Sequence, residues 1–292
     1  MDGVLVVDKP KNMTSHDVVN IARKALGTKR IGHTGTLDPN ATGLLILAVG
    51  KATKLVKYFT EDRKTYEGTI LIGQGYDTDD VTGKLINEID ASSIPESKIR
   101  EILETFIGKQ KQIPPAYSAI KIQGQKLYEL ARKNIVMPHV EPRDVEVFNI
   151  DNVGIIYLEK TIEIKLRLDV SKGTYIRSIA RDLGEQLGNC GSLIDLRRIK
   201  INRFNIDEAY TIEQLQKEGN QVVLKEPFEY LDLPSIIVDK NVENDINFGR
   251  FIELDFFKEK TDTIIYSLEK EPLAIYYYDE VKNIMRMSVK WC

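Results

Sequence analysis

The sequence predicts an α+β protein, with a mixed, mostly antiparallel sheet, flanking helices and a small β-rich C-terminal domain. Strand-like segments follow one another through turns as well as through helices, so the regular βαβ repeat of a doubly wound fold is missing. After about residue 231 the pattern changes to short strand-like runs without helical periodicity. A chain of 292 residues is long enough for one large core and a smaller second domain.

The N-terminal elements alternate between strand and helix. GVLVVDKP (3–10) is a β-rich run that ends at a proline, and it predicts a strand. In SHDVVNIARKALG (15–27) apolar residues recur at helical spacing, with Ser15 as the expected N-cap and Gly27 just after the last turn. LLILAVG (44–50) predicts a buried strand, followed by a short helix around residues 53–59.

Later segments continue the mixture of strands and helices. Alternation predicts strands at 65–74 and 160–170, and helical spacing predicts helices at 95–108 and before Gly188. We therefore expect one domain over residues 1–230 and a β-rich domain over 231–292. The strand-like runs of the second domain are SIIVD, RFIELDFF and PLAIYYYD.

Composition is that of a soluble globular protein, with 42% hydrophobic and 29% charged residues. The two cysteines, Cys190 and Cys292, form neither a disulfide framework nor a metal-binding spacing. The longest apolar run, residues 44–49, is too short to span a bilayer, and the N-terminus has no signal-peptide pattern. We expect a cytoplasmic protein without membrane association.

Charge is distributed unevenly along the chain, although the net charge is only −3. Residues 1–60 contain nine Lys or Arg and four Asp or Glu, whereas residues 204–292 contain ten and eighteen. This asymmetry favours a basic N-terminal surface that binds a polyanion and an acidic C-terminal region. The alternative is that both regions are ordinary solvated surfaces that bind no partner, which would give the same charge counts.

Several familiar motifs are absent. Gly73-Gln74-Gly75 lacks the third glycine and the following helix of a dinucleotide loop. DTDDVTGKLINE (77–88) has acidic residues near calcium-loop spacing, but Val81 replaces a ligand, so a turn is expected. The three histidines have no paired spacing. We expect no metal and no cofactor.

One loop, GHTGTLDPNATG (32–43), places a carboxylate, Asp38, among glycines just before the buried strand. An Asp-Pro pair usually marks a turn. Glycines, however, let a backbone approach a ligand closely, and loops carry function more often than the scaffold beneath them. Asp38 and its neighbour His33 are therefore candidates for a functional site.

This loop closely resembles the nucleophile loop of the tRNA pseudouridine synthase B family, which converts the T-loop uridine (U55) of tRNA to pseudouridine. The N-terminal run GVLVVDKPKNMTSHDVV (3–19) is similar to that family's first motif. KTYEGTILIGQGYDTDDVTG (64–83) and VSKGTYIRSIARDLGEQLG (170–188), with LRRIKI (196–201), resemble two further motifs. All four occur in the family's order, over residues 3 to about 203.

The resemblance implies an isomerase that needs no cofactor and uses Asp38 as its nucleophile. A carboxylate can form a covalent adduct and so divide one difficult step into two. Whether it attacks the sugar or the base stays open. Arg177 of GTYIR matches the family's arginine, whose charge would favour the ionised carboxylate; the other interpretation is a solvated residue at the start of a helix.

The same resemblance gives roles to four more residues. Tyr66 matches the tyrosine that stacks on the target base and is a candidate for the C5 proton transfer. Tyr175 and Leu196 match positions that line the uridine pocket, although each could equally be a packing residue. His33 matches the residue that enters the stack when the uridine flips out, an extrusion that costs a few kcal/mol.

RNA binding also requires cations that contact phosphates. Residues 111–133 resemble the family's RNA-clasping insertion, which would act as a lid; the alternative is an ordinary connection. Family members usually end in a PUA-like RNA-binding domain, whereas this C-terminal region is acidic. We expect a monomer that binds the tRNA T-arm without an obligatory protein partner. The expected phosphate contacts are Lys9, Arg30, Lys54, Arg197 and Arg198.

Three other functions fit parts of the sequence. A guide-RNA-dependent pseudouridine synthase shares the nucleophile loop but carries longer basic extensions. A tRNA-binding or tRNA-folding protein would not need catalysis, although Asp38, Tyr66 and Arg177 are all present. A retaining glycosidase would need a second carboxylate about 5–5.5 Å from the first, and no motif places one.

Overall fold

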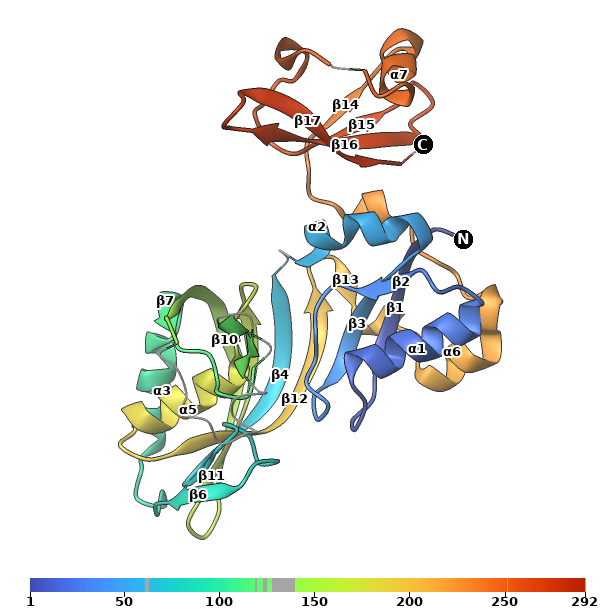
Figure 1. The fold of residues 1–292 in the computed structure, drawn as a ribbon. Helices are drawn as coiled ribbons and strands as arrows, with labels where there is room; N and C mark the ends of the chain where they lie inside the picture. Colours follow the sequence, from blue (N-terminus) through green and yellow to red (C-terminus); the bar gives the residue numbers. More distant parts are fainter. Residues whose placement is uncertain (61–62, 119, 123–124, 128–139, 251, 292) are drawn as a thin grey trace.

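The computed structural model describes residues 1–292 except 61–62, 119, 123–124, 128–139, 251 and 292. Its centre is a nine-stranded sheet in the order β1-β3-β12-β4-β11-β10-β7, with β2 paired to β3 and β13 paired to β12 (Figure 1). One pair, β3–β12, is parallel and the others in this sheet are antiparallel, which confirms the expected mixed, mostly antiparallel sheet. The strands are β1 (Gly3–Lys9), β2 (Ile31–His33), β3 (Thr42–Val49), β4 (Lys64–Ile72), β7 (Gly108–Gln112), β10 (Arg143–Tyr157), β11 (Ile162–Val170), β12 (Gly191–Ile201) and β13 (Phe204–Asn205).

The β1–β3 part of the sheet is buried on both faces. Leu5 and Val7 face one core with α1 (Ser15–Leu26) and α6 (Ile212–Glu218), whereas Val4 and Val6 face a second core on the other side. This two-sided burial explains the continuous apolar run of β3.

The N-cap of α1 is Thr14, not Ser15 as expected. Thr14 and Asp17 form a reciprocal capping box, in which each side chain accepts from the other's backbone N–H. Ser15 is therefore the first residue of the helix, and its buried hydroxyl is available for a different contact.

The other half of the sheet packs against α3 (Glu96–Thr105) and α5 (Ile176–Gln186), around an apolar core that includes residues of β4, β10 and β11. A hairpin of β5 (Gln74–Tyr76) and β6 (Leu85–Glu88) carries the turn of residues 77–84 beside β12. The acidic run at this position is a turn, as expected. A short helical segment, η1 (Gly50–Leu55) followed by α2 (Val56–Thr60), lies after β3.

The C-terminal region is a four-stranded sheet with one helix, α7 (Lys240–Asn247). The helix was not expected, yet Asp239 caps it by accepting from the N–H groups of Asn241 and Val242, and Ile246 is buried against the sheet. RFIELDFF is not a strand in its described residues and contains only the short helical turn Leu254–Phe256. None of the described helices has the length and apolar character that a membrane crossing requires. The strands are β14 (Ser235–Ile237), β15 (Thr263–Tyr266), β16 (Pro272–Asp279) and β17 (Ile284–Lys290).

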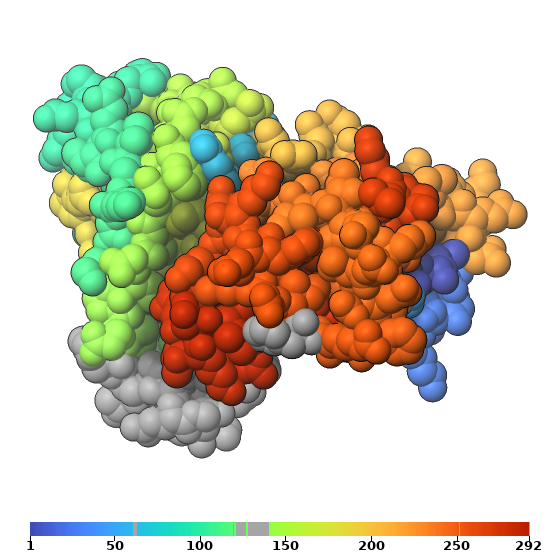
Figure 2. Space-filling view, turned by 90° about the horizontal axis from the view of Figure 1, so that it is seen from above, coloured from blue at the N-terminus to red at the C-terminus, as the bar shows by residue number. Residues whose placement is uncertain are grey.

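The C-terminal sheet lies beyond α2 in Figure 1 and, seen from above, covers the middle of the molecule (Figure 2). Phe228 makes edge-to-face contacts with Tyr266 and Trp291, so one apolar core is shared by the two sheets. The Tyr58 hydroxyl donates to Ser288 Oγ at 3.0 Å. Apolar packing and hydrogen bonds thus hold the C-terminal region in a fixed position.

Candidate active site

The candidate nucleophile lies in the loop between β2 and β3, residues 34–41. Leu37 is buried, whereas the next side chain, that of Asp38, is about half exposed. The Asp38 carbonyl accepts from Ala41 N–H at 3.1 Å, which closes a tight turn around Pro39. The turn interpretation and the functional interpretation are therefore compatible, because the turn presents the carboxylate.

The N-terminal segment fixes this loop on both sides of Asp38. Ser15 Oγ accepts from Leu37 N–H at 2.9 Å and donates to its carbonyl at 3.3 Å. On the other side, the Pro39 carbonyl accepts from Asn12 N–H at 2.8 Å and from Lys9 Nζ at 3.3 Å. The loop is thus held through backbone groups, which leaves the carboxylate itself free to react.

Arg198 holds the loop from β12. Its guanidinium is buried and donates to the carbonyls of Leu44 at 2.8 Å and Gly35 at 3.1 Å. Gly43 allows β3 to come this close, because a Cβ there would lie 2.2 Å from the Arg198 carbonyl oxygen.

The Asp38 carboxylate forms an ion pair with Arg177, with 2.9 Å between Oδ2 and Nη2. The Arg177 side chain is only 6% exposed, and its guanidinium also donates to the carbonyls of Thr78 and Tyr117, both at 3.1 Å. Three separate segments therefore meet at this arginine. The ion pair orients the Asp38 carboxylate toward Arg177, and a carboxylate is a group that can act as a nucleophile.

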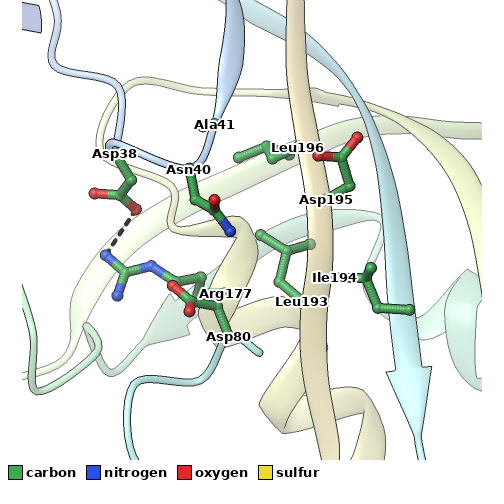
Figure 3. Close-up of a pocket in the computed structure, with 9 residues that line it drawn as sticks. All are labelled: Asp38, Asn40, Ala41, Asp80, Arg177, Leu193, Ile194, Asp195 and Leu196. Carbon is green, nitrogen blue, oxygen red and sulfur yellow. Dashed lines mark ion pairs between the residues drawn. The ribbon is translucent and has the colours of Figure 1, made fainter. Parts of the chain in front are cut away.

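A hollow opens beside this ion pair (Figure 3). Asn40 points into it near Arg177, and Leu193 and Leu196 of β12 form an apolar wall opposite Asp38. A site with an apolar wall and a few converging polar groups is typical of small-ligand binding. The lining residues are Asp38, Asn40, Ala41, Asp80, Arg177, Leu193, Ile194, Asp195 and Leu196.

Of the residues expected at the site, the structure brings Asp38, Arg177 and Leu196 to this hollow. Tyr66 is buried in the adjoining apolar core with Ala41, and Leu196 packs against the same core. Tyr175 directly precedes α5, and burial raises the pKa of its hydroxyl.

His33 ends β2, directly before the 34–41 loop, and does not line the hollow. Its imidazole is half-buried, and burial, together with the positive charge of Arg198, lowers its pKa. His33 Nδ1 is buried and has no hydrogen-bond partner in the described structure. The lowered pKa favours the neutral imidazole.

The five basic residues expected at RNA phosphates occupy different environments. Lys9 and Arg198 are buried beneath the 34–41 loop, so the expectation of phosphate contacts is corrected for these two. Lys54 Nζ donates to the Lys290 carbonyl at 2.8 Å. Arg197 forms a two-hydrogen-bond pair with Asp8 and is partly exposed. Arg30 is exposed and donates to Thr53 Oγ1 at 3.1 Å.

The expected RNA-clasping insertion, residues 111–133, lies partly outside the described residues. Its described start forms the end of β7 and the segment 113–118, which contacts α5. Within the described residues no group of three or more His, Cys, Asp or Glu side chains could hold a metal ion.

Comparison with known proteins agrees with this geometry. Residues 23–176 match the TruB family pseudouridylate synthase N-terminal domain, and residues 177–232 match the tRNA pseudouridylate synthase B C-terminal domain. The chain belongs to the TruB family. Pseudouridine synthases are isomerases, so the expected enzyme class is confirmed.

Curated relatives resemble the chain over most of its length. It is 38% identical to tRNA pseudouridine synthase B of Oceanobacillus iheyensis over 99% of both chains. It is 37% identical to the enzyme of the same name from Halalkalibacterium halodurans, over 94% of this chain and 92% of the relative. The enzyme of Alkaliphilus oremlandii is 44% identical over 79% and 75%.

Solved structures share the fold. A structure described as a Cbf5-Nop10-Gar1 complex matches with a TM-score of 0.71 and 23% identity, over 99% of this chain and 84% of the other. A structure described as an H/ACA RNP bound to a substrate RNA with 2′-deoxyuridine matches with a TM-score of 0.67 and 22% identity, over 99% and 84%. The fold of these two structures thus extends over 99% of this chain.

Sequence reasoning missed several residues of this TruB site. Asn40, Asp80 and Asp195 line the hollow, but none of them had been named as a candidate for the site. The Asp80 carboxylate is occupied by the turn, accepting from Thr82 N–H at 2.8 Å. No local signal distinguishes Asp195, because its position depends on the pairing of β12 with β4.

Proposed function

We propose that the chain converts the T-loop uridine at position 55 of tRNA to pseudouridine, with Asp38 as the nucleophile and without a cofactor. The observation that carries this proposal is the ion pair of Asp38 with the buried Arg177 at the edge of an apolar-walled hollow. The relatives' names, tRNA pseudouridine synthase B, support tRNA as the substrate.

The reaction breaks the bond between C1′ and N1 of the uridine and forms one between C1′ and C5. Asp38 holds the sugar or the base covalently while the base turns, the C5 proton leaves, and N1 gains a proton, so no redox change occurs. Arg177 orients the Asp38 carboxylate through their ion pair. Tyr66 stacks on the base and serves the C5 proton transfer, and Leu196 bounds the pocket.

Access to the uridine requires that it leave the stacked loop. His33, neutral and half-buried at the edge of the catalytic loop, fills the space that the base vacates. Tyr175 lies next to the pocket at the start of α5. We also propose that residues 1–230 form the catalytic domain, that residues 231–292 form a PUA-like domain, and that the monomer acts on the T-arm without a protein partner.

The test is tritium release from a tRNA transcript labelled at C5 of its uridines. Wild type releases the tritium of one uridine, and a transcript with cytidine at position 55 releases none. Asp38→Asn keeps tRNA affinity and releases none. Asp232→Asn is the control and keeps the wild-type release, because Asp232 is exposed, does not line the hollow and forms its ion pair with Arg203.

Either of two results would contradict the proposal. Activity in Asp38→Asn would remove the assigned nucleophile. Tight tRNA binding by the wild type without release would instead favour the binding or folding role, or a missing guide RNA.

A further inference from the structure

Arg181 lies one helical turn after Arg177 on α5 and is not part of the hollow. Its guanidinium forms an ion pair with Asp79, 3.0 Å from Nη1 to Oδ2, and donates from Nη2 to the Ile113 carbonyl at 3.0 Å. It also pairs with its neighbour Asp182. The Arg181 side chain is 24% exposed and that of Asp79 only 16%, so this pair is largely removed from water.

These two contacts reach the same two segments that Arg177 uses. Asp79 follows Thr78, whose carbonyl accepts from Arg177 Nη1, and Ile113 begins the segment whose Tyr117 carbonyl accepts from Arg177 Nη2. Each of the two arginines therefore bridges the 77–84 turn and the 113–118 segment.

The 77–84 turn has a backbone conformation that needs support, and the 113–118 segment is held by α5. Asp79 has φ 59°, in the left-handed region that non-glycine residues rarely occupy. Its backbone is fixed by Leu193, which donates to its carbonyl at 3.0 Å, and its side chain is fixed by Arg181. Ile113 also accepts from Ser178 Oγ at 2.9 Å, so α5 holds this carbonyl twice.

We propose that Arg181 is a positioning residue for the reaction. By holding Asp79 and Ile113 it fixes the carbonyls of Thr78 and Tyr117, and these fix the guanidinium of Arg177 opposite Asp38. This inference rests on the proposed role of the Asp38–Arg177 pair. Through the Tyr117 carbonyl and Arg177, the 113–118 segment is thereby linked to the Asp38 carboxylate.

The alternative is that Arg181 only neutralises a buried carboxylate. Three variants separate the two roles by single-turnover rate at saturating tRNA, tRNA affinity and thermal unfolding. Arg181→Met removes both contacts. Arg181→Lys keeps the positive charge beside Asp79, but an ammonium lacks the planar fork that spans two acceptors. The double variant Arg181→Met/Asp79→Asn removes the pair together with the charge of Asp79, the more buried of the two carboxylates that Arg181 contacts.

Positioning predicts that Arg181→Met reacts about 10²-fold more slowly with unchanged tRNA affinity, since displacements of about 1 Å have effects of that size. The Lys variant stays well below the wild-type rate. The double variant regains thermal stability relative to Arg181→Met but not the rate. Arg100→Met, which breaks an exposed ion pair with Glu96 on α3, is the matched control and keeps the wild-type rate.

Recovery of the rate together with stability, in the Lys or the double variant, would show charge compensation alone and overturn the inference. A wild-type rate in Arg181→Met would overturn it as well. Failure of the proposed function is separate, because it appears as activity in Asp38→Asn whatever the Arg181 variants do.

Discussion

Replacement of Gly43 by alanine tests how far the catalytic loop depends on the contact between β3 and β12. These strands pair through only two positions, Thr42 with Arg197 and Gly43 with Arg198, and this parallel pair joins the two halves of the sheet. At Gly43 a Cβ would lie 2.2 Å from the Arg198 carbonyl oxygen and 2.8 Å from its nitrogen. Both atoms belong to the backbone, so no side-chain rotation can relieve the clash.

The magnitude has two parts. Gly43 has φ 101°, and a residue with a side chain at such an angle costs roughly 1–3 kcal/mol. Overpacking between two strands adds about 1–3 kcal/mol. We therefore expect the free energy of unfolding in urea to fall by about 2–6 kcal/mol. Gly27→Ala is the control: Gly27 has φ 63° with nothing within 4 Å of the added Cβ, so only about 1–2 kcal/mol is lost.

Activity should separate the two variants further. Movement of β3 away from β12 displaces the Arg198 side chain, which holds the carbonyls of Gly35 and Leu44. The single-turnover rate of tritium release in Gly43→Ala should fall by about 10²-fold under conditions where the protein is folded. Equal losses of stability in Gly43→Ala and Gly27→Ala, or a normal rate in Gly43→Ala, would refute this reasoning.

Three further predictions concern single contacts. Ser15→Ala leaves the buried N–H of Leu37 without a partner, so it should lose about 1–3 kcal/mol in urea unfolding and slow tritium release; a normal rate would show that the loop does not need this contact. Burial lowers the pKa of Lys9 to about 8, so the 13Cε resonance of Lys9 should titrate near pH 8. The resonance is assigned as the one that disappears from the spectrum of the Lys9→Met variant. In the unfolded chain Lys9 keeps its proton up to its ordinary pKa of 10.5, so the free energy of unfolding should rise with pH between about 8 and 10.5. A Lys9 resonance that titrates near pH 10.5 in the folded protein would contradict the structure. Burial raises the pKa of Tyr58 to about 12, so Tyr58→Phe should remove one late ionisation from the ultraviolet titration and lose about 1 kcal/mol; an unchanged titration curve would count against its buried contact with Ser288.

The sequence allowed prediction of the fold class and of most strands and helices, because apolar periodicity reflects burial on one or two faces. The misassigned features include the N-cap of α1 and helix α7. Thr14 and Ser15 are both good N-caps, and the structure selects Thr14 because Ser15 binds the backbone of Leu37. Helix α7 is short and polar, with Ile246 as its only fully buried apolar residue, so its periodicity was too weak to recognise.

The site was predictable only where a motif carries it. Asp38 and Arg177 come from segments far apart in the sequence, and their pairing followed from the resemblance, not from periodicity. Asp195 could not be assigned, because its place at the hollow depends on the register of β12 against β4, which includes two irregularities. Local sequence does not specify such long-range register.

Charge counts alone overestimate the cations available to RNA in the first 60 residues. Lys9 is buried and donates to three backbone carbonyls behind the catalytic loop. Lys51 and Lys54 donate to the carbonyls of Trp291 and Lys290, at the end of the C-terminal sheet. Part of the basic excess therefore holds the loop of Asp38 and the acidic C-terminal region in place. Because binding weakens with salt in proportion to the phosphates that are neutralised, these three lysines should contribute little to the salt dependence of tRNA binding.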